Sequence, residues 1–534
     1  MRRFNTTGLC VPDQDYMVDI SDKIRRIKEM VDRGDYFTIN RARQFGKTTT
    51  LSQLGKALFN EYICVRTSFE GIGDEPFEDP ESFCRVFLKL IQQALRYSSA
   101  GEDTAYIDHW FDDTVTGFQQ LGDHIGRMCR GRKLVLMIDE VDKMSNNRVY
   151  IHFLGMLRDR YLARKEGMGF TFQSVILAGV YDIKNIKLKM INEGVYSAAA
   201  AEGKLYNSPW NIAADFTVDM SFKADEIMTM LRDYEDDWHT GMDIEAVAEG
   251  IYEYSSGYPF LVSRICKLID ERFERDWSGE GLLKAVQYLV RQEQNTLFDD
   301  IFKNLEAFPD LYQLIYDLLI SGKGNEKNYS AGDPVVSWAL MFGFVNNKDG
   351  KIQIANRIFE LLITGYFLSK DVRRQDTKTV GGVFKYDVVK DGRFDMELCL
   401  RRFARHFRQV FSKDDAAFLE RQGRLVFLSF LAPLINGEGF YYIESETTDA
   451  QRMDLVVTYG REEFIIELKI WRGEAAHRAG YEQLAEYLRR KGRKEGYLLS
   501  FDFRQEDNRE KREEWIALSA PGGGEDLRVF DIRL

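Results

Sequence analysis

The consecutive residues Gly46, Lys47 and Thr48 have the types and the order of a loop that binds nucleotide phosphates. They follow a short apolar run at 36–39 and precede a helical pattern over 49–62. Backbone N–H groups at the start of a helix attract anions, a lysine reaches the outer phosphates, and a hydroxyl coordinates magnesium. The order of strand, tight loop and helix therefore predicts a phosphate loop, against the alternative of a solvated loop before a helix.

The loop departs at its first position from the usual pattern, which is GxxxxGK followed by serine or threonine. Arg41 stands where that pattern has its first glycine. Arg41 either gives the loop a different entry turn or places a second cation near the phosphates. Arg41, Arg43 and Thr49 are therefore included among the candidate nucleotide-binding residues.

An acidic pair follows an apolar run further along the chain. The run covers 134–138 and ends in Asp139 and Glu140. A carboxylate in this position can hold a magnesium-bound water, and its neighbour can act as the base for an attacking water. We therefore expect Thr48 and Asp139 to hold Mg²⁺ and Glu140 to be catalytic. Two solvated acids after a core strand are the alternative.

Strand-like runs alternate with helical patterns through the first part of the chain. The runs lie at 36–39, 63–69, 134–138 and 175–180, and the helical patterns at 20–31, 49–62, 80–97, 107–129 and 149–164. This alternation implies a parallel sheet covered on both faces. We therefore expect a P-loop NTPase domain of the α/β class in 1–221.

Five residues beyond the acidic pair have less certain roles. Tyr181 or Asp182, after the last strand, either senses the outer phosphate or caps a helix. Arg158, Arg160 and Arg164 follow one another along a predicted helix. An arginine finger is one interpretation of these arginines, and a solvated helix face is the more ordinary one.

A second set of residues near the C-terminus has the types of a metal site. Asp454 begins one strand-like run, and Glu467 and Lys469 lie near the end of the next. Because side chains alternate along a strand, Glu467 and Lys469 share a face, and a hairpin can bring Asp454 to that face. Two carboxylates this close need a cation, and hard oxygen ligands suit Mg²⁺ or Mn²⁺.

This arrangement predicts metal-dependent cleavage of a phosphodiester, in which Lys469 orients the nucleophile or offsets the developing charge. Charged residues on a half-exposed hairpin are the alternative. Gln483 and Tyr487, spaced four apart on the next helix, are candidate substrate contacts. Basic residues near this site either follow a nucleic-acid backbone or form a solvated helix face: Arg401, Arg402, Arg405, Arg408, Arg489, Arg490, Lys491, Arg493 and Lys494.

The middle of the chain is mainly helical. Helical patterns cover 224–237, 243–255, 259–273 and 281–305, and a compact helical unit at 308–365 contains a hairpin at 343–354. Helices followed by such a hairpin suggest a winged helix. A polar stretch at 369–380 is the expected linker. Beyond it, helices at 393–411 and 416–435 are followed by strands at 440–447, 453–459 and 464–471, a helix at 475–491 and a strand at 496–503.

Composition sets limits on the kind of protein. The chain has 534 residues, of which 44% are hydrophobic and 30% charged, so it is globular and long enough for several domains. Its net charge of −12 argues against indiscriminate binding of polyanions. No apolar stretch approaches the roughly 20 residues of a membrane span. The six cysteines are scattered, so we expect a reducing, cytoplasmic setting.

Four segments resemble the bacterial AAA-ATPase-like family, which is related to the archaeal-type and STAND ATPases. They are 16–19, 40–48, 138–142 and 206–210. In this family the missing first glycine is usual, and the resemblance implies ATP as the nucleotide. STAND-type ATPases have Gly-x-Pro where Gly257, Tyr258 and Pro259 stand, with the proline near adenine, and a winged helix follows.

The C-terminal segment resembles the PD-(D/E)XK nuclease superfamily. Asp454, Glu467 and Lys469 match its metal and lysine positions, and Gln483 with Tyr487 match the QxxxY motif of its RecB-like members. The resemblance implies a nuclease with Mg²⁺, and Mn²⁺ as a second possible metal, and nucleic acid as the partner.

These observations together predict a bacterial ATP-binding switch coupled to a metal-dependent nuclease. The expected divisions are a nucleotide domain at 1–221, a helical lid at 222–306, a winged helix at 307–370, a linker at 371–382 and a nuclease domain at 383–534. No membrane contact is expected, and a homo-oligomer is possible. The alternative is a non-catalytic, nucleotide-gated regulator that binds nucleic acid or a protein partner through a degenerate nuclease fold.

Overall fold

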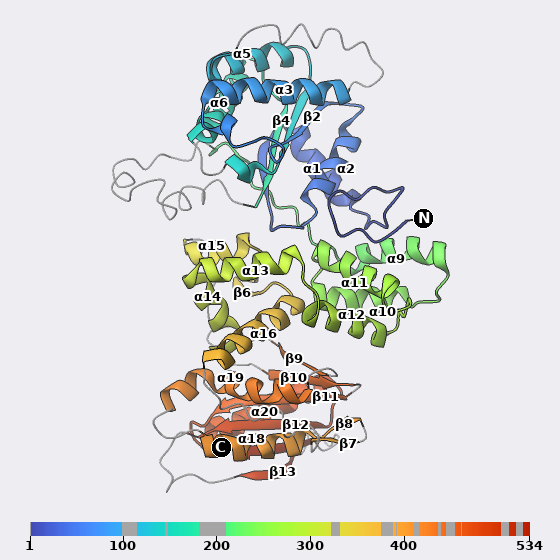
Figure 1. The fold of residues 1–534 in the computed structure, drawn as a ribbon, viewed down its shortest axis with the longest axis vertical. Coiled ribbons are helices and arrows are strands. Elements are labelled where there is room, and N and C mark those ends of the chain that lie inside the picture. The colour runs from blue at the N-terminus through green and yellow to red at the C-terminus, as the bar shows by residue number, and fades with distance from the viewer. Residues whose placement is uncertain are drawn as a thin grey trace. The chain divides into compact units, whose positions relative to one another are not determined.

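The computed structural model in Figure 1 divides into two compact units. The first comprises Met1–Asp299 with Met341–Gly343, and the second comprises Asp300–Leu340 with Phe344–Leu534. The residues that the structure describes are 2–98, 115–144, 148–180, 210–321, 330, 332–374, 388–390, 392–410, 416–435, 439–444, 454–460, 462–502, 512–518 and 527–534.

The first unit contains a four-stranded parallel sheet in the order β1-β4-β3-β2. Its strands are β1 (Tyr36–Asn40), β2 (Ile63–Ser68), β3 (Leu134–Asp139) and β4 (Ser174–Gly179). Alternate residues of β3 enter two separate cores, with Leu136 and Ile138 in one and Val135 and Met137 in the other. The sheet is therefore buried on both faces, and the expected α/β fold is confirmed.

Helices cover the two faces of this sheet (Figure 1). One core contains residues of α1 (Ser21–Asp32) and α2 (Lys47–Leu58). The other contains residues of α3 (Pro80–Ser98), α5 (Phe118–Cys129) and α6 (Arg148–Lys165). The helix expected over 107–129 begins at Phe118 in the structure, and residues 99–114 lie outside the described part.

A group of helices completes the first unit. These are α9 (Ala224–Trp238), α10 (Ile244–Ser255), α11 (Pro259–Glu271), α12 (Gly279–Arg291) and the start of α13 (Thr296–Ala307). The expectation of a single helix over 281–305 was wrong, because α12 ends at Arg291 and a separate helix, α13, begins at Thr296. Asn295 accepts a hydrogen bond from the backbone N–H of Phe298 at 3.0 Å, and such a cap starts a new helix rather than continuing the old one.

The second unit begins with helices and a small hairpin. They are α14 (Pro309–Tyr316), a π-helical turn η3 (Asp317–Ser321), α15 (Pro334–Met341), β5 (Val345–Lys348), β6 (Lys351–Ile354) and α16 (Arg357–Arg374). α16 continues to Arg374, so the first four residues of the linker expected at 371–382 are helical. Polar residues without glycine or proline do not stop a helix. The remainder of that linker lies outside the described residues.

The C-terminal part of the second unit is a six-stranded mixed sheet in the order β13-β14-β12-β11-β10-β9. Its strands are β9 (Gly439–Glu444), β10 (Asp454–Tyr459), β11 (Glu462–Ile470), β12 (Glu495–Phe501), β13 (Glu513–Leu518) and β14 (Leu527–Arg533). Its helices are α18 (Met396–Val410), α19 (Ala416–Ile435) and α20 (Glu474–Arg490). The expected order of helix, three strands, helix and strand is present.

Several elements at the C-terminal end were not expected. Strands β13 and β14 extend the sheet beyond β12, and β7 (Val389–Lys390) pairs with β8 (Arg393–Phe394) before α18. The helix expected from residue 393 begins at Met396, because Asp395 caps it by accepting the backbone N–H of Leu398 at 2.9 Å. Among the helices of the described residues, none combines the length and apolar character of a membrane span.

Candidate functional site

The phosphate loop lies between β1 and α2, and its backbone is held in unusual conformations. Gly46 immediately precedes α2 with a φ of 77°, a left-handed value that favours glycine. Gln44 has a φ of 56°, which is uncommon for a residue with a side chain. Lys47 and Thr48 belong to the first turn of α2, so the N–H groups at the start of that helix face the loop.

Lys47 is buried, with 6% of its surface exposed. Its Nζ donates hydrogen bonds to the backbone carbonyls of Arg41 and Ala42, each at 3.0 Å. Burial lowers the pKa of Lys47, and the carboxylates of Glu140 and Asp142 oppose that shift. A buried ammonium needs acceptors, and the two carbonyls supply them.

Thr48 and the acidic pair meet at the end of β3. The hydroxyl of Thr48 donates to Oδ2 of Asp139 at 2.7 Å, so two hard oxygen atoms stand side by side. The backbone N–H of Glu140 donates to Oδ1 of Asp139 at 3.0 Å. A hydroxyl beside a carboxylate is a donor set that suits Mg²⁺, so the residues present fit this ion.

Glu140 is strained and partly buried. Its φ of 54° is left-handed, a conformation that costs a residue with a side chain about 1 kcal/mol or more. Burial raises the pKa of Glu140, and Lys47 partly offsets the effect. Such strain and such a shift are common at catalytic positions, and they agree with the predicted role of a base.

The two arginines of the loop lie differently from each other. The guanidinium of Arg41 donates to the carbonyls of Asn40 at 2.9 Å and Val218 at 3.0 Å, and its central carbon lies 5.5 Å from the ring centre of Phe216. These contacts tie Arg41 to the backbone of Asn40 and Val218, and both of its expected roles stay predictions. The side chain of Arg43 is exposed.

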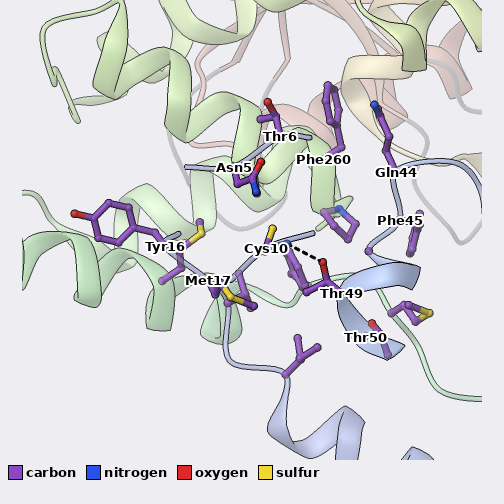
Figure 2. Close-up of a pocket in the computed structure, with 18 of the residues that line it drawn as sticks. Asn5, Thr6, Cys10, Tyr16, Met17, Gln44, Phe45, Thr49, Thr50 and Phe260 are labelled. Carbon is purple, nitrogen blue, oxygen red and sulfur yellow. Dashed lines mark hydrogen bonds between the residues drawn. The ribbon is translucent and has the colours of Figure 1, made fainter. Parts of the chain in front are cut away.

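A cavity of about 150 Å³ opens beside the loop (Figure 2). It is lined by Gly46 and Thr49 of the loop and α2 and by Pro259 and Phe260 at the start of α11. Thr49 accepts a hydrogen bond through its hydroxyl oxygen from the backbone N–H of Cys10 at 3.3 Å. The predicted residues Thr49 and Pro259 thus share one pocket next to the phosphate loop.

The third wall of this pocket is the N-terminal strap, residues 2–19, which sequence reasoning missed. Arg2 pairs with Asp233 at 2.9 Å and with Asp237 at 3.0 Å, both on α9. Tyr16 donates its hydroxyl to Asp237 at 2.9 Å, and burial together with this bond raises the pKa of Tyr16 to about 12. The only sequence signal was the resemblance of residues 16–19, because the partners lie more than 200 residues away.

Two of the three candidate arginines of the first unit have structural contacts, and the two candidate phosphate sensors lie outside the described residues. Arg164 donates to the carbonyls of Phe172, Gln173 and Gly34, and Arg160 pairs with Asp123 at 2.6 Å. Arg164 thus binds the backbone of two loops, and Arg160 joins α6 to α5. Tyr181 and Asp182 lie outside the described residues.

The hairpin of β10 and β11 forms the second candidate site. In its register Asp454 stands directly opposite Glu467, and opposed residues of an antiparallel pair have Cα atoms about 4.5 to 5.5 Å apart. The Glu467 side chain is buried, with 1% exposed, and Nζ of Lys469 lies 2.6 Å from its Oε1. Lys469 also donates to Oε1 of Gln483 on α20 at 2.8 Å. The structure therefore brings Glu467, Lys469 and Gln483 together, and Asp454 to the same position along the hairpin.

Tyr487, one helical turn after Gln483, is buried rather than open to a substrate. Its hydroxyl has no hydrogen-bond partner among the described residues, and the guanidinium carbon of Arg490 lies 4.9 Å from its ring centre. No group of three His, Cys, Asp or Glu side chains with metal-binding geometry occurs in the described part of the chain. The chemistry of two opposed acidic residues beside a lysine still fits a hard divalent cation.

The basic clusters expected near this site have mixed positions: Arg490 and Lys491 lie against the ring of Tyr487, whereas other members pair with acidic residues elsewhere. Arg401 and Arg408 pair with Glu513 on β13, at 3.1 and 2.8 Å, and two strands separate β13 from β11. Arg493 lies 3.8 Å from Glu463, four residues before Glu467 on β11. A strand rises about 3.3 Å per residue, so Glu463 is more than 10 Å along the strand from the hairpin site.

Arg424 on α19 is a buried cation that sequence reasoning missed. It donates to the carbonyl of Leu319 in η3 at 3.2 Å, and it interacts electrostatically with Glu360 of α16 and Glu467. Burial lowers the pKa of Arg424 to about 10, although both glutamates oppose the shift. The available signal was its position directly before the longest apolar stretch, 425–435.

A buried polar network fixes the start of α20 and was also missed. Nε2 of His477 lies 2.9 Å from Oδ2 of Asp531 on β14, and Tyr481 donates to the same oxygen at 2.5 Å. Nδ1 of His477 lies 3.4 Å from the hydroxyl oxygen of Ser500 on β12. The four residues belong to α20, to β12 beside β11, and to β14 beyond β12, so the network holds the helix that carries Gln483 against the sheet.

The geometry defines a P-loop ATPase fold joined to a second α/β fold with an acidic hairpin. A family model described as the AAA-like domain matches residues 14–285, just over half of the chain. The chain therefore belongs to the AAA-like domain family. A model of the PD-(D/E)XK nuclease superfamily matches residues 439–513, which include the hairpin of β10 and β11.

Three solved structures are similar to this chain at low identity. The Walker-type ATPase of Pyrococcus abyssi is 12% identical, with 67% of this chain and 99% of its own covered and a TM-score of 0.46. ORC1 of Aeropyrum pernix in complex with DNA is 12% identical, with 67% and 94% covered and a TM-score of 0.29. ORC2 of the same organism, in ADPNP and ADP complexes, is 14% identical, with 68% and 97% covered and a TM-score of 0.31. A search of curated proteins finds no significant match.

Proposed function

We propose that the chain is an ATP-binding and ATP-hydrolysing switch whose C-terminal domain cleaves nucleic-acid phosphodiesters with Mg²⁺ or Mn²⁺. The observation that carries the first half is the meeting of Lys47, Thr48, Asp139 and Glu140 beside a pocket. The second half rests on the buried pair of Glu467 and Lys469 with Asp454 opposite.

In the nucleotide site, each residue has a separate task. Lys47 would exchange its two carbonyl acceptors for phosphate oxygens, since charge-assisted hydrogen bonds to phosphate are stronger than those to neutral carbonyls. Thr48 and Asp139 would hold Mg²⁺, which offsets the charge of the phosphates. Glu140 would accept a proton from the attacking water, and the pocket with Pro259 would hold the adenine.

In the hairpin site, Asp454 and Glu467 would hold the divalent ion, whose chemistry is to stabilise negative charge on the phosphodiester. Lys469 would shift from Glu467 toward the reacting phosphate. Gln483 already accepts from Nζ of Lys469 at 2.8 Å and would keep the ammonium oriented during that shift. Tyr487 would support α20 from the buried side.

We also propose the organisation around the two sites. A nucleotide domain covers 1–221, a helical lid 222–306, a winged helix 307–370 and a nuclease domain 383–534. The resemblance to bacterial ATPases and the absence of paired cysteines support a bacterial cytoplasmic setting. A homo-oligomer is compatible with this proposal.

One observation favours a second function, that of a non-catalytic regulator with a degenerate nuclease fold. The ammonium of Lys469 lies 2.6 Å from Oε1 of Glu467, at a place where a metal ion would otherwise bind. In such a regulator, the ATP site would control binding of nucleic acid or of a protein partner without cleavage.

Cleavage assays on the full chain separate these functions. Purified protein is incubated with plasmid, linear DNA and RNA, with and without ATP and with Mg²⁺ or Mn²⁺. We expect metal-dependent cleavage in the native chain and in Glu463→Gln, a control on the same hairpin, and none in Asp454→Ala or Glu467→Gln. ATP affinity is measured by calorimetry in every variant and should not change.

Retention of cleavage in Asp454→Ala would refute the assigned site. Binding of nucleic acid without cleavage in the native chain would support the regulator instead.

A further inference from the structure

The chain crosses between its two units at three points, and two segments beside these crossings touch the phosphate loop. The first crossing lies inside α13, after Asp299. The chain then returns to the first unit for Met341–Gly343 and leaves again at Phe344. Both segments that belong to the first unit at these crossings contact residues 42–44 of the loop.

The first contact joins the loop to the start of α13. Nε2 of Gln44 donates to the hydroxyl oxygen of Thr296 at 3.0 Å, and 252 residues of sequence separate the two. Thr296 is the first residue of α13, three residues before the crossing. Gln44 holds a left-handed φ of 56° and also lines the pocket beside the loop, so this contact ties a strained loop residue to the helix that leaves the unit.

The second contact joins the loop to Gly343. A Cβ built on Gly343 would lie 2.9 Å from Cβ of Ala42, and the φ of Gly343 is +75°. Both facts require glycine at this position. Ala42 is buried, and its carbonyl is one of the two acceptors of Nζ of Lys47. Gly343 therefore packs on the residue whose carbonyl would lose its hydrogen bond when Lys47 turns to a phosphate.

A third contact, from the lid, holds the residue between these two. The hydroxyl of Tyr258 donates to the carbonyl of Arg43 at 2.5 Å, and the same Cβ built on Gly343 would lie 3.9 Å from Cε2 of Tyr258. Three consecutive loop residues are thus held by three segments that are distant in sequence. A change in the loop backbone must be accommodated by these segments, because packed contacts do not deform continuously.

We propose that the contacts Gln44 to Thr296 and Ala42 to Gly343 transmit nucleotide occupancy from the phosphate loop to the C-terminal unit. The proposal rests on the proposed function in one respect, namely that the loop binds ATP. Two elements move in response to ATP: α13 beyond Thr296, and the segment that leads from Gly343 into β5. The winged helix then acts as a relay.

Hydrogen exchange of the full chain, followed by mass spectrometry with and without ATP and Mg²⁺, tests this proposal. In the native chain, ATP should change the exchange of residues 300–316 and 344–354. Thr296→Val removes the acceptor of Gln44 and should lose this change, whereas Thr296→Ser keeps the hydroxyl and should retain it. Gly343→Ala should lose the change as well, because the new Cβ has no room beside Ala42.

Two matched controls are available in the first unit. Thr116→Val removes a hydroxyl that likewise bonds to a glutamine side chain, Gln120, at 3.1 Å, but away from the loop. Gly241→Ala introduces a Cβ at a φ of +76° where no atom lies within 4 Å. Both controls should respond to ATP as the native chain does.

Calorimetry with ATP separates the possible failures. If the native chain binds no ATP, the proposed function fails and this proposal with it. If the native chain and Thr296→Val both bind ATP and show the same change in the second unit, the proposal alone is overturned. It is also overturned if ATP binds to the native chain and leaves residues 300–316 and 344–354 unchanged. Should Gly343→Ala not fold, the pair Thr296→Val and Thr296→Ser decides the matter.

Discussion

The two candidate sites differ in the partners that their charged side chains have. In the nucleotide site, the buried ammonium of Lys47 is held by two neutral carbonyls, and the carboxylate of Asp139 by a hydroxyl and an N–H group. In the hairpin site, Lys469 pairs directly with the carboxylate of Glu467. With its proposed ligand, the first site would exchange neutral partners for a charged one, whereas the second would have to rearrange an ion pair.

The two sites also differ in how their residues come together. Thr48 and Asp139 are 91 residues apart and meet only because β1 and β3 belong to one parallel sheet. Asp454 and Glu467 are opposed by the register of a single hairpin. The nucleotide site thus depends on the whole first unit, while the hairpin site depends mainly on local pairing. Four variants test this difference.

The largest effect is expected at Glu140. Replacing it by glutamine removes the proposed base, and general-base catalysis commonly contributes about 10²- to 10⁴-fold, so ATP hydrolysis should fall by that factor while ATP binding persists. Phosphate release measures ATP hydrolysis, and calorimetry measures ATP binding. Glu166→Gln, an exposed position of the same unit, is the control. Equal hydrolysis in both variants would remove Glu140 from the mechanism.

The pH dependence of the native chain follows from the same residue. Burial raises the pKa of Glu140, and a base acts only when deprotonated. Hydrolysis should therefore be lost on acidification at a pH above the ordinary glutamate value of about 4.3. The acid limb of kcat/KM reports this group in the unliganded enzyme. An acid limb at or below the ordinary value would contradict the assignment.

Lys469→Met should lower cleavage by about 10²- to 10³-fold, because it removes a charge aimed at the reacting phosphate. Binding of Mn²⁺, followed by calorimetry, should persist or strengthen, since the variant no longer has an ammonium beside Glu467. Lys390→Met, an exposed lysine on β7 of the same unit, is the control. Loss of Mn²⁺ binding would mean that Lys469 organises the hairpin rather than the chemistry.

Lys47→Ala should weaken ATP binding by about thirtyfold or more, the consequence of removing one partner from a buried charged contact. The control is Lys56→Ala, an exposed lysine on the same helix. Fluorescent nucleotide titration measures both variants. Cleavage in the absence of ATP should be the same in both, because the two sites belong to separate units. Unchanged ATP affinity in Lys47→Ala would contradict the proposed role of Lys47 in binding the phosphates.

The smallest effect is expected at Arg424. Replacing it by methionine leaves Glu467 without one of its two nearby cations, so the melting temperature of the second unit should fall by about 5 to 10 °C. Scanning calorimetry measures this shift, and excess Mn²⁺ should reverse part of it. The exposed Arg489→Met serves as control. Equal melting of both variants would show that Arg424 does not stabilise Glu467.

Sequence reasoning succeeded where the signal is local. The order of β1, loop and α2, the apolar strand before Asp139, and the hairpin that opposes Asp454 and Glu467 all follow from short-range spacing. The predicted helix ends were wrong where a capping side chain started a new helix, or where no glycine or proline ended one. Asn295 split one expected helix into two, and α16 ran on to Arg374 through residues expected to be a linker.

Sequence reasoning failed also where residues meet through tertiary packing alone. The N-terminal strap, Arg424 and the network of His477 with Asp531 carry no pattern in the sequence that marks them. Arg401 and Arg408 were expected near the hairpin because of their place in the sequence, yet both pair with Glu513 on β13. Sequence distance did not predict spatial distance there.

The α/β class, the phosphate loop and the acidic hairpin could be predicted from the sequence, because periodicity and motif spacing are properties of neighbouring residues. The structure was needed to show that Arg41 bonds to the carbonyl of Val218, that Lys47 is buried against two carbonyls, and that Gln44 bonds to Thr296. Contacts of this kind join segments up to 252 residues apart, and their energies depend on burial and direction, which no local pattern specifies.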